Sequence, residues 1–368
     1  MNPWRRVEAL ADELAGNGEL TDKVWREALH AVPRHLFVPA VAWVNPYEAP
    51  GYRIDRERDP DSWWTAAYAD LSIITQLDDG MTELGGGSSG DYTSSLSAPG
   101  AVVEFLELLD PYDGDRVLEI GTGTGWTAGL LSHRVGDTNV TSVEIDQAVL
   151  AVAATNLKEA GYAPRLVHGD GEKGRPEAAP FDRVHVTCGV VTVPYAWVEQ
   201  TRPGGTIAFP WMPEFEPGHK VSLTVGRDGT ATGRFSGGAR YMMLRGQRTP
   251  DSPTYEGAYR KREATLDPRR IFRSGYGFDV AMAGCLPDVS VATNDGGPFE
   301  VWLWAGGSGA HLSGSDVRQF GDRSLWDEVE GVFFRWVGWG HPERSRFGMT
   351  VTAEGQHIWL DLPDNPIA

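Results

Sequence analysis

A glycine-rich turn between an apolar strand and a helix constrains the fold of this chain more than any other feature. The short apolar run 116–120 leads into Gly121, Gly123 and Gly125, and a helical pattern follows over 126–135. Glycine lets a ligand approach the backbone closely, and the first turn of a helix offers N–H groups without partners inside the helix. The segment therefore predicts a strand–turn–helix unit that binds a small ligand.

Apolar strands and helices alternate regularly after residue 101. Buried strands are expected at 140–144, 165–168, 182–188 and 206–209, and helices at 102–109, 126–135, 147–160 and from Tyr195 onward. Strands that alternate with helices of about 10–15 residues predict a mostly parallel sheet with helices on both faces. We therefore expect a Rossmann-like α/β core over residues 96–248.

The N-terminal residues 1–95 are predicted to form a helical and lid region. The first helix is expected from apolar residues at helical spacing, namely Val7, Leu10 and Leu14. Thr21-Asp22 supplies an N-cap for a second helix, which Pro33 ends. From Val44 to Gly100 the composition shifts to Pro, Gly, Asp and Ser, and it includes the glycine-rich run 85–90, whose backbone is costly to order. A mobile lid or connector is expected there.

The residues after the core predict a different architecture. Asp228-Gly229 is flanked by the segments 221–225 and 231–235, which is a strong hairpin signal. A connector is expected over 249–273. Strands are expected at 278–282, 299–304 and 357–360. Residues 249–368 are therefore predicted to form a C-terminal β-rich accessory module.

Charge and cysteine content exclude several classes of partner. The formal net charge of −18 opposes binding to nucleic acids and anionic membranes, because Lys and Arg carry most recognition of such partners. Cys188 and Cys285 form no C-x-x-C pair, and the nine histidines lack metal-ligand spacing, so neither a disulfide framework nor a metal is expected. No apolar run approaches the roughly 18 residues of a membrane span. These features favour a cytoplasmic protein and leave its oligomeric state open.

Acidic residues at successive strand ends distinguish between two ligands for the glycine turn. A dinucleotide site has the pattern G-x-G-x-x-G, whereas the third glycine here comes too early, and Glu119 suits a cationic amino-acid head better than a pyrophosphate. Glu144 ends the next strand, where a carboxylate can accept both ribose hydroxyls, and Asp170 follows the third strand, near the expected adenine edge. The set favours S-adenosyl-L-methionine. The predicted cofactor contacts are Glu119, Gly121, Thr122, Gly123, Gly125, Glu144, Ile145, Gly169, Asp170, Gly171 and Thr187.

A set of short motifs extends over roughly residues 30–245. They include Pro33-Arg34-His35-Leu36-Phe37-Val38-Pro39, Tyr68-Ala69-Asp70, Ser97-Ala98-Pro99, the glycine turn, Gly169-Asp170-Gly171, Arg202-Pro203-Gly204-Gly205 and Arg240-Tyr241-Met242-Met243-Leu244-Arg245. Together they resemble the protein-L-isoaspartate O-methyltransferase family. The resemblance implies a class I Rossmann-like S-adenosylmethionine methyltransferase core and the transfer of a methyl group to a carboxylate.

Ser97 acquires a chemical role from this resemblance, because the matching hydroxyl in the family contacts the methyl-accepting carboxylate. The alternative is that Ser97 only caps the helix that begins near Pro99. Thr75 is a second candidate for the same pocket. Ser97 and Thr75 are therefore the predicted catalytic residues.

Three departures from the family pattern bear on the substrate. Gly100 stands where the family often has His, the segment 70–97 is stretched by the glycine-rich run, and more than 100 residues follow Arg245. The long tail resembles a bacterial branch that acts on ribosomally made modified peptides, of the graspetide (ATP-grasp) or lanthipeptide type. We therefore expect methylation of an Asp side chain in a macrocyclic precursor peptide, leading to an aspartimide or to isoaspartate. Repair of damaged isoaspartyl proteins and a non-catalytic binding module are the alternatives.

Overall fold

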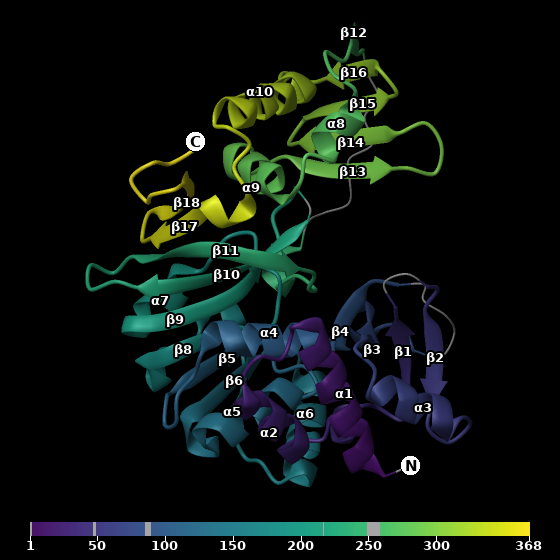
Figure 1. Cartoon of the computed structure of the whole chain (residues 1–368), viewed down its shortest axis with the longest axis vertical. Coiled ribbons are helices and arrows are strands. Elements are labelled where there is room, and N and C mark those ends of the chain that lie inside the picture. The colour runs from purple at the N-terminus through teal and green to yellow at the C-terminus, as the bar shows by residue number, and fades with distance from the viewer. Residues whose placement is uncertain (1, 47–48, 85–89, 216, 249–257) are drawn as a thin grey trace. The chain divides into compact units, whose positions relative to one another are not determined.

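Two compact units make up the chain (Figure 1). The computed structural model describes residues 2–46, 49–84, 90–215, 217–248 and 258–368. The first unit contains Met1–Cys188 and Ala196–Phe209, and the second contains Gly189–Tyr195 and Pro210–Ala368. Among the described residues, no helix is long and apolar enough to cross a lipid bilayer. The three-domain division at residues 95 and 248 stays a prediction.

The N-terminal helices agree with the pattern of the sequence. They are α1 (Pro3–Asn17), α2 (Lys23–Ala31) and α3 (Pro60–Ala67), with a 3-10 turn, η1 (Arg34–Phe37), after α2. Val7, Leu10 and Leu14 are buried on one face of α1. The side chain of Asp22 accepts a hydrogen bond from the backbone of Val24 and caps α2, as predicted.

A four-stranded antiparallel sheet occupies much of the region predicted as a lid. Its strands are β1 (Val41–Asn45), β2 (Tyr52–Asp55), β3 (Ser72–Leu77) and β4 (Tyr92–Leu96), in the order β2-β1-β3-β4 (Figure 1). These strands were not predicted from the sequence, and the lid role of this region stays a prediction. The four short strands lie among Pro, Gly and Asp residues, so their apolar alternation is too brief to stand out. Residues 85–89 of the predicted lid lie outside the described residues.

The parallel sheet of the first unit confirms the predicted alternation of strands and helices. Its strands are β5 (Val117–Ile120), β6 (Val140–Glu144), β7 (Arg165–His168), β8 (Phe181–Val186) and β9 (Thr201–Trp211), in the order β9-β8-β5-β6-β7. The helices of this part are α4 (Pro99–Leu109), α5 (Trp126–Val135), α6 (Gln147–Ala160) and α7 (Tyr195–Glu199). The chain order reverses beside β5, which pairs in parallel with both β6 and β8. Ligands bind at such a switch point, outside the carboxyl ends of the strands.

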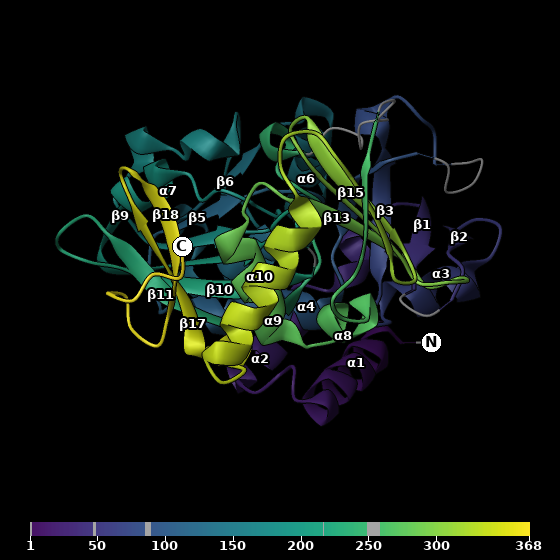
Figure 2. The same cartoon turned by 90° about the horizontal axis from the view of Figure 1, so that it is seen from above.

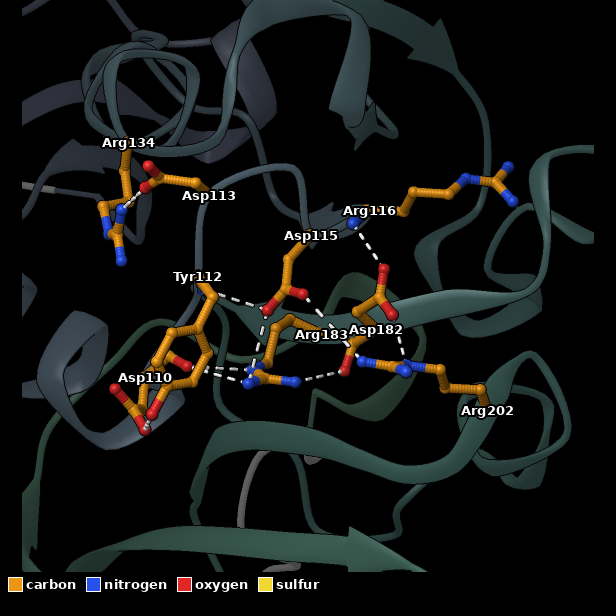
Figure 3. A network of polar contacts seen from close by, with 9 residues as sticks. All are labelled: Asp110, Tyr112, Asp113, Asp115, Arg116, Arg134, Asp182, Arg183 and Arg202. Carbon is orange, nitrogen blue, oxygen red and sulfur yellow. Dashed lines mark hydrogen bonds and ion pairs between the residues drawn. The ribbon is translucent and has the colours of Figure 1, made fainter.

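An ion-pair network joins the opposite, amino ends of these strands (Figure 3). The guanidinium of Arg183 donates to the carbonyls of Asp110 (2.9 Å) and Asp182 (3.0 Å) and lies 3.3 Å from the carboxylate of Asp115. Arg202 pairs with Asp182. The network therefore ties the turn before β5 to the starts of β8 and β9, far along the strands from the glycine turn.

The second unit contains a four-stranded antiparallel arrangement built on the predicted hairpin. Its strands are β10 (Gly218–Val225), β11 (Ala231–Ala239), β17 (Phe347–Thr352) and β18 (Gly355–Leu360), in the order β18-β17-β11-β10. Gly229 has a φ of +78°, as a tight Asp-Gly hairpin turn requires. The predicted hairpin and the strand at 357–360 are therefore confirmed.

A five-stranded antiparallel sheet forms the rest of the second unit. Its strands are β12 (Arg260–Glu263), β13 (Ser290–Asn294), β14 (Glu300–Ala305), β15 (Ser308–Ser313) and β16 (Asp316–Phe320), in the order β12-β16-β15-β14-β13. Its helices are α8 (Pro268–Phe272), α9 (Tyr276–Cys285) and α10 (Leu325–Gly338), and α10 runs across this sheet (Figure 2). The β-rich character of the C-terminal module is thus confirmed. The strand predicted at 278–282 is wrong, because this segment lies within α9. Its residues are buried throughout, and a helix buried on all sides has no polar face to reveal its period.

Candidate active site

The glycine turn follows β5 directly and has the backbone that only glycine adopts easily. Gly121, Gly123 and Gly125 have φ values of +92°, +54° and +92°. A Cβ atom on Gly121 would lie 2.5 Å from Oγ1 of Thr187 and 2.6 Å from Sγ of Cys188. The hydroxyl of Thr187 donates to the carbonyl of Gly121 over 2.5 Å. Thr187, predicted as a cofactor contact, therefore supports the turn through its hydroxyl.

Glu144 lies at the carboxyl end of β6 and is tied to the glycine turn. One carboxylate oxygen accepts the backbone N–H of Gly123 over 3.0 Å, and the other accepts that of Asp146 over 3.1 Å. Burial raises the pKa of this carboxyl above its usual range, and the hydrogen bond from Gly123 opposes the shift. Ile145 follows with 38% of its surface exposed. An acidic and an apolar side chain thus lie next to each other at the strand end where the sequence predicted the ribose.

Glu119 is fully buried in β5, beneath the turn. The hydroxyl of Ser142 donates to its Oε2 over 2.5 Å and lies 2.6 Å from the hydroxyl of Thr122. Within the described part of the chain, Oε1 of Glu119 has no hydrogen-bond partner. Burial raises the pKa of Glu119 to about 8, although the bond from Ser142 lowers it. Because an unsatisfied buried acceptor is costly, this oxygen points to a ligand donor that the protein alone does not supply.

The segment Gly169-Asp170-Gly171 directly follows β7, the third strand of the parallel sheet in chain order. The backbone N–H of Gly169 donates to the carbonyl of Glu144 over 2.9 Å. The carboxylate of Asp170 accepts the backbone N–H of Glu172 over 3.0 Å and starts the 3-10 turn η4 (Gly171–Lys173). The structure therefore brings the predicted residues that follow β5, β6 and β7 to one edge of the sheet.

Ser97 follows β4 and is half-buried. Ala98 occupies the N-cap position of α4 and makes no side-chain cap bond, so the alternative in which Ser97 only caps this helix is wrong. Thr75 lies where the pairing of β3 with β4 shifts register, and its hydroxyl donates to that of Ser94 over 3.1 Å. Such bulges are frequent beside active sites. The catalytic roles of Ser97 and Thr75 stay predictions.

The strand pair β3–β4 passes beside the glycine turn. A Cβ atom on Gly123 would lie 3.4 Å from the carbonyl oxygen of Ser95, two residues before Ser97. In addition, Nε2 of Gln76 donates to Asp146 over 3.1 Å, just after Ile145. The sequence analysis missed Gln76 and Asp146. An Asp ahead of a helical pattern is an N-cap signal that identifies Asp146, whereas nothing in the sequence links Gln76 to a residue so far along the chain.

The residues at this edge fit S-adenosyl-L-methionine. Glu144 can accept hydroxyl groups of a ribose, the unsatisfied oxygen of Glu119 suits a cationic head, and Ile145 offers an apolar surface to a base. A parallel sheet with its switch point beside β5, carrying this donor set, defines the class of S-adenosyl-L-methionine-dependent methyltransferases. Comparison with known proteins places the chain more closely within that class.

Residues 5–244 match the protein-L-isoaspartate(D-aspartate) O-methyltransferase (PCMT) family, and the chain belongs to this family. It is similar to protein-L-isoaspartate O-methyltransferase 2 of Archaeoglobus fulgidus, with 32% identity over 248 residues that cover 65% of this chain and 93% of the relative. It is also similar to the protein-L-isoaspartate O-methyltransferase of Thermococcus onnurineus, with 38% identity over 161 residues, or 42% and 70% of the two chains. The protein is accordingly an S-adenosyl-L-methionine-dependent carboxyl O-methyltransferase.

One solved structure shares the fold over nearly the whole chain. It is described as a protein-L-isoaspartate O-methyltransferase, and the match covers 97% of this chain and 100% of that chain, with a TM-score of 0.56 and 21% identity. The match therefore extends well beyond residue 244, where the family match ends. The fold of the part beyond residue 244 thus has a counterpart in a solved structure.

Proposed function

We propose that this protein transfers a methyl group from S-adenosyl-L-methionine to the free carboxylate of an L-isoaspartyl residue in a protein or peptide. The single observation that carries the proposal is the approach of Ser95 to Gly123, because it brings β4, which ends just before Ser97, to the cofactor turn. The relatives named above support the same acceptor.

The reaction requires little chemistry from the protein. S-Adenosyl-L-methionine supplies an electrophilic methyl group on a sulfonium. A carboxylate oxygen forms a bond to this carbon as the sulfur–carbon bond breaks, so that a neutral ester and a neutral thioether result. The free group of an isoaspartyl residue is its α-carboxylate, with an ordinary pKa of roughly 3.3–3.7, so it is already ionised at pH 7 and needs no general base. Alignment alone can contribute roughly 7–11 kcal/mol, and we assign part of it to the Ser97 hydroxyl, which would hold one carboxylate oxygen.

Methylation of an Asp side chain in a macrocyclic, ribosomally made peptide is the second candidate. The following backbone nitrogen would displace methanol from the ester and form an aspartimide. Gly100 favours this candidate, because the family often has His there. A Cβ atom on Gly100 would lie only 2.8 Å from the carboxylate of Glu19 and 3.0 Å from that of Asp70. Two carboxylates therefore occupy the space that a His side chain at position 100 would need, and this difference from the family supports a different acceptor.

Three peptides of the same sequence distinguish the candidates. The first is linear with one L-isoaspartyl residue, the second is linear with Asp, and the third is a macrocycle with Asp. We expect S-adenosylhomocysteine and a mass gain of one methyl group with the first peptide only. Turnover of the macrocycle alone would replace the first candidate with the second. Turnover of none of them, with intact cofactor binding, would favour a non-catalytic binding module.

A further inference from the structure

Arg34 is a buried cation held by backbone carbonyls. It lies in η1, and only 1% of its surface is exposed. Its Nη1 donates to the carbonyls of Ala66, Ala67 and Ala69 over 3.4, 3.2 and 3.2 Å, and its Nη2 donates to those of Leu71, Leu96 and Ser97 over 2.8, 3.5 and 3.0 Å. Burying a charge is costly, and burial lowers the pKa of Arg34 to about 9 while the negative charge of Asp70 opposes the shift. The side chain of Arg34 thus joins residues 66–71 to residues 96–97.

The two segments that Arg34 joins have different roles. One is the turn 66–71, which comprises the last two residues of α3 and the four residues after it. The other is Leu96-Ser97, which lies where the methyl acceptor is predicted to bind. The guanidinium also lies 5.4 Å from the ring of Trp126, the first residue of α5 after the glycine turn. Arg34 therefore contacts both the segment that carries Ser97 and the helix that begins at the cofactor turn.

Asp70 holds the same segment from its other side. Its Oδ1 accepts the backbone N–H of Gly100 over 2.7 Å, three residues after Ser97. Asp70 belongs to the turn 66–71 whose carbonyls surround Arg34. The backbone on both sides of Ser97 is thus anchored to one turn, on one side through Arg34 and on the other through Asp70.

We propose that Arg34, with Asp70 as its companion, is a positioning residue that sets the place of Ser97 relative to the glycine turn. The inference rests on the proposed function, since Ser97 is the group that is positioned. A planar guanidinium reaches both carbonyl sets with two nitrogens, whereas the single nitrogen of lysine cannot occupy both positions. A lysine at position 34 keeps the positive charge but loses the hydrogen bonds to one of the two segments.

Arg34→Lys tests this proposal against a matched control. Arg183→Lys also changes a buried arginine that donates to backbone carbonyls, but at the opposite ends of the strands. We expect Arg34→Lys to lower kcat on the isoaspartyl peptide by roughly 10- to 100-fold, because a misplacement of about 1 Å has effects of that size. The Kd of S-adenosyl-L-methionine should change less than about threefold, and Arg183→Lys should lower the melting temperature without lowering kcat.

The Ser97→Ala background separates positioning from a general structural role. If Arg34 acts through Ser97, Arg34→Lys lowers kcat in the wild type and not in Ser97→Ala. A wild-type kcat in Arg34→Lys, or an equal loss in both backgrounds, would overturn the proposal. If Arg34→Lys does not fold, Asp70→Ala replaces it in the same comparison of the wild-type and Ser97→Ala backgrounds. We expect Asp70→Ala to lower kcat several-fold when Ser97 is present and to leave kcat unchanged in Ser97→Ala. If the wild-type protein methylates no isoaspartyl peptide, the result refutes the proposed function instead.

Discussion

Glu119 on β5 and Ser142 on β6 are paired in register, and the Ser142 hydroxyl donates to the Glu119 carboxyl over 2.5 Å. The bond satisfies one carboxyl oxygen and leaves Oε1 without a partner in the described part of the chain. Burial nevertheless dominates and raises the pKa of Glu119 to about 8. Glu119 is therefore a group whose charge the unliganded fold disfavours.

This raised pKa predicts how stability depends on pH. Between the ordinary pKa of 4.5 and the folded value of about 8, the folded state retains a proton that the unfolded state has lost. The contribution of Glu119 to the free energy of unfolding is full below pH 4.5 and declines as pH rises towards 8. We expect the free energy of unfolding of Glu119→Gln to exceed that of the wild type by about 1–3 kcal/mol at pH 9. At pH 5 this difference in stability should disappear. Denaturant titrations of both proteins without cofactor at pH 5 and pH 9 measure this difference in the free energy of unfolding. A difference that does not change with pH would contradict the assigned pKa.

Glu144 is expected to act on cofactor affinity before turnover. Its two oxygens hold the backbone of Gly123 and Asp146, and Glu144→Ala removes both bonds together with the predicted ribose acceptor. Hydrogen bonds to charged groups contribute about 1.5–3 kcal/mol, so the Kd of S-adenosyl-L-methionine should rise roughly 10- to 100-fold in calorimetry. Glu177→Ala, which changes an exposed glutamate paired with Arg175, is the control and should bind normally. Unchanged binding in Glu144→Ala would remove this residue from the cofactor site.

The sequence pattern alone groups the candidate cofactor residues, whereas it does not link Gln76 or Arg34 to their partners, and chain distance explains the difference. Glu119, Glu144 and Asp170 lie in or just after the last residues of three successive strands, so the rule for parallel sheets places them together without further information. Gln76 and Arg34 reach their partners across many residues, through contacts that have no periodic signal. Their places depend on the antiparallel sheet β1–β4, whose strands are too short for pattern analysis to identify.

Helix α9 shows the same limit inside the second unit. Phe278 to Ala283 are buried on all sides, so the apolar run has no period of 3.6 residues to distinguish it from a strand. Of the five strands in the neighbouring sheet, the sequence predicted only β14, whose residues alternate between buried and partly exposed. Alternation is visible only where solvent reaches one face of the element.

Ser97 is expected to influence turnover without supporting the fold. Because Ala98 is the N-cap of α4, Ser97→Ala removes no cap and should change the free energy of unfolding by no more than about 0.5 kcal/mol. We expect kcat on the isoaspartyl peptide to fall by roughly 10- to 100-fold if the hydroxyl orients the acceptor. Thr75→Ala, which loses a hydroxyl bonded to Ser94, should have a smaller effect. Loss of cofactor affinity in Ser97→Ala, measured by calorimetry, would instead assign Ser97 to the scaffold.

The network at the amino ends of the strands is expected to support stability and not activity (Figure 3). The ion pair of Arg183 with Asp115 is 3.3 Å long, and its side chains are only 8% and 12% exposed. Removing one partner of a buried pair leaves an uncompensated charge, so Arg183→Ala should lower the free energy of unfolding by about 3–5 kcal/mol. Arg134→Ala is the control, because its partner Asp113 is 89% exposed, and exposed pairs contribute about 0–1 kcal/mol.

Arg183→Ala and Arg134→Ala also show whether a loss of stability at the amino ends of the strands changes cofactor binding at their carboxyl ends. Both should bind S-adenosyl-L-methionine with the wild-type Kd at temperatures where they are folded, since the glycine turn lies at the other ends of β5 and β8. Calorimetry and denaturant titration on the same samples measure the two quantities. A Kd that rises in Arg183→Ala while the protein is still folded would mean that the network also holds the cofactor edge in place.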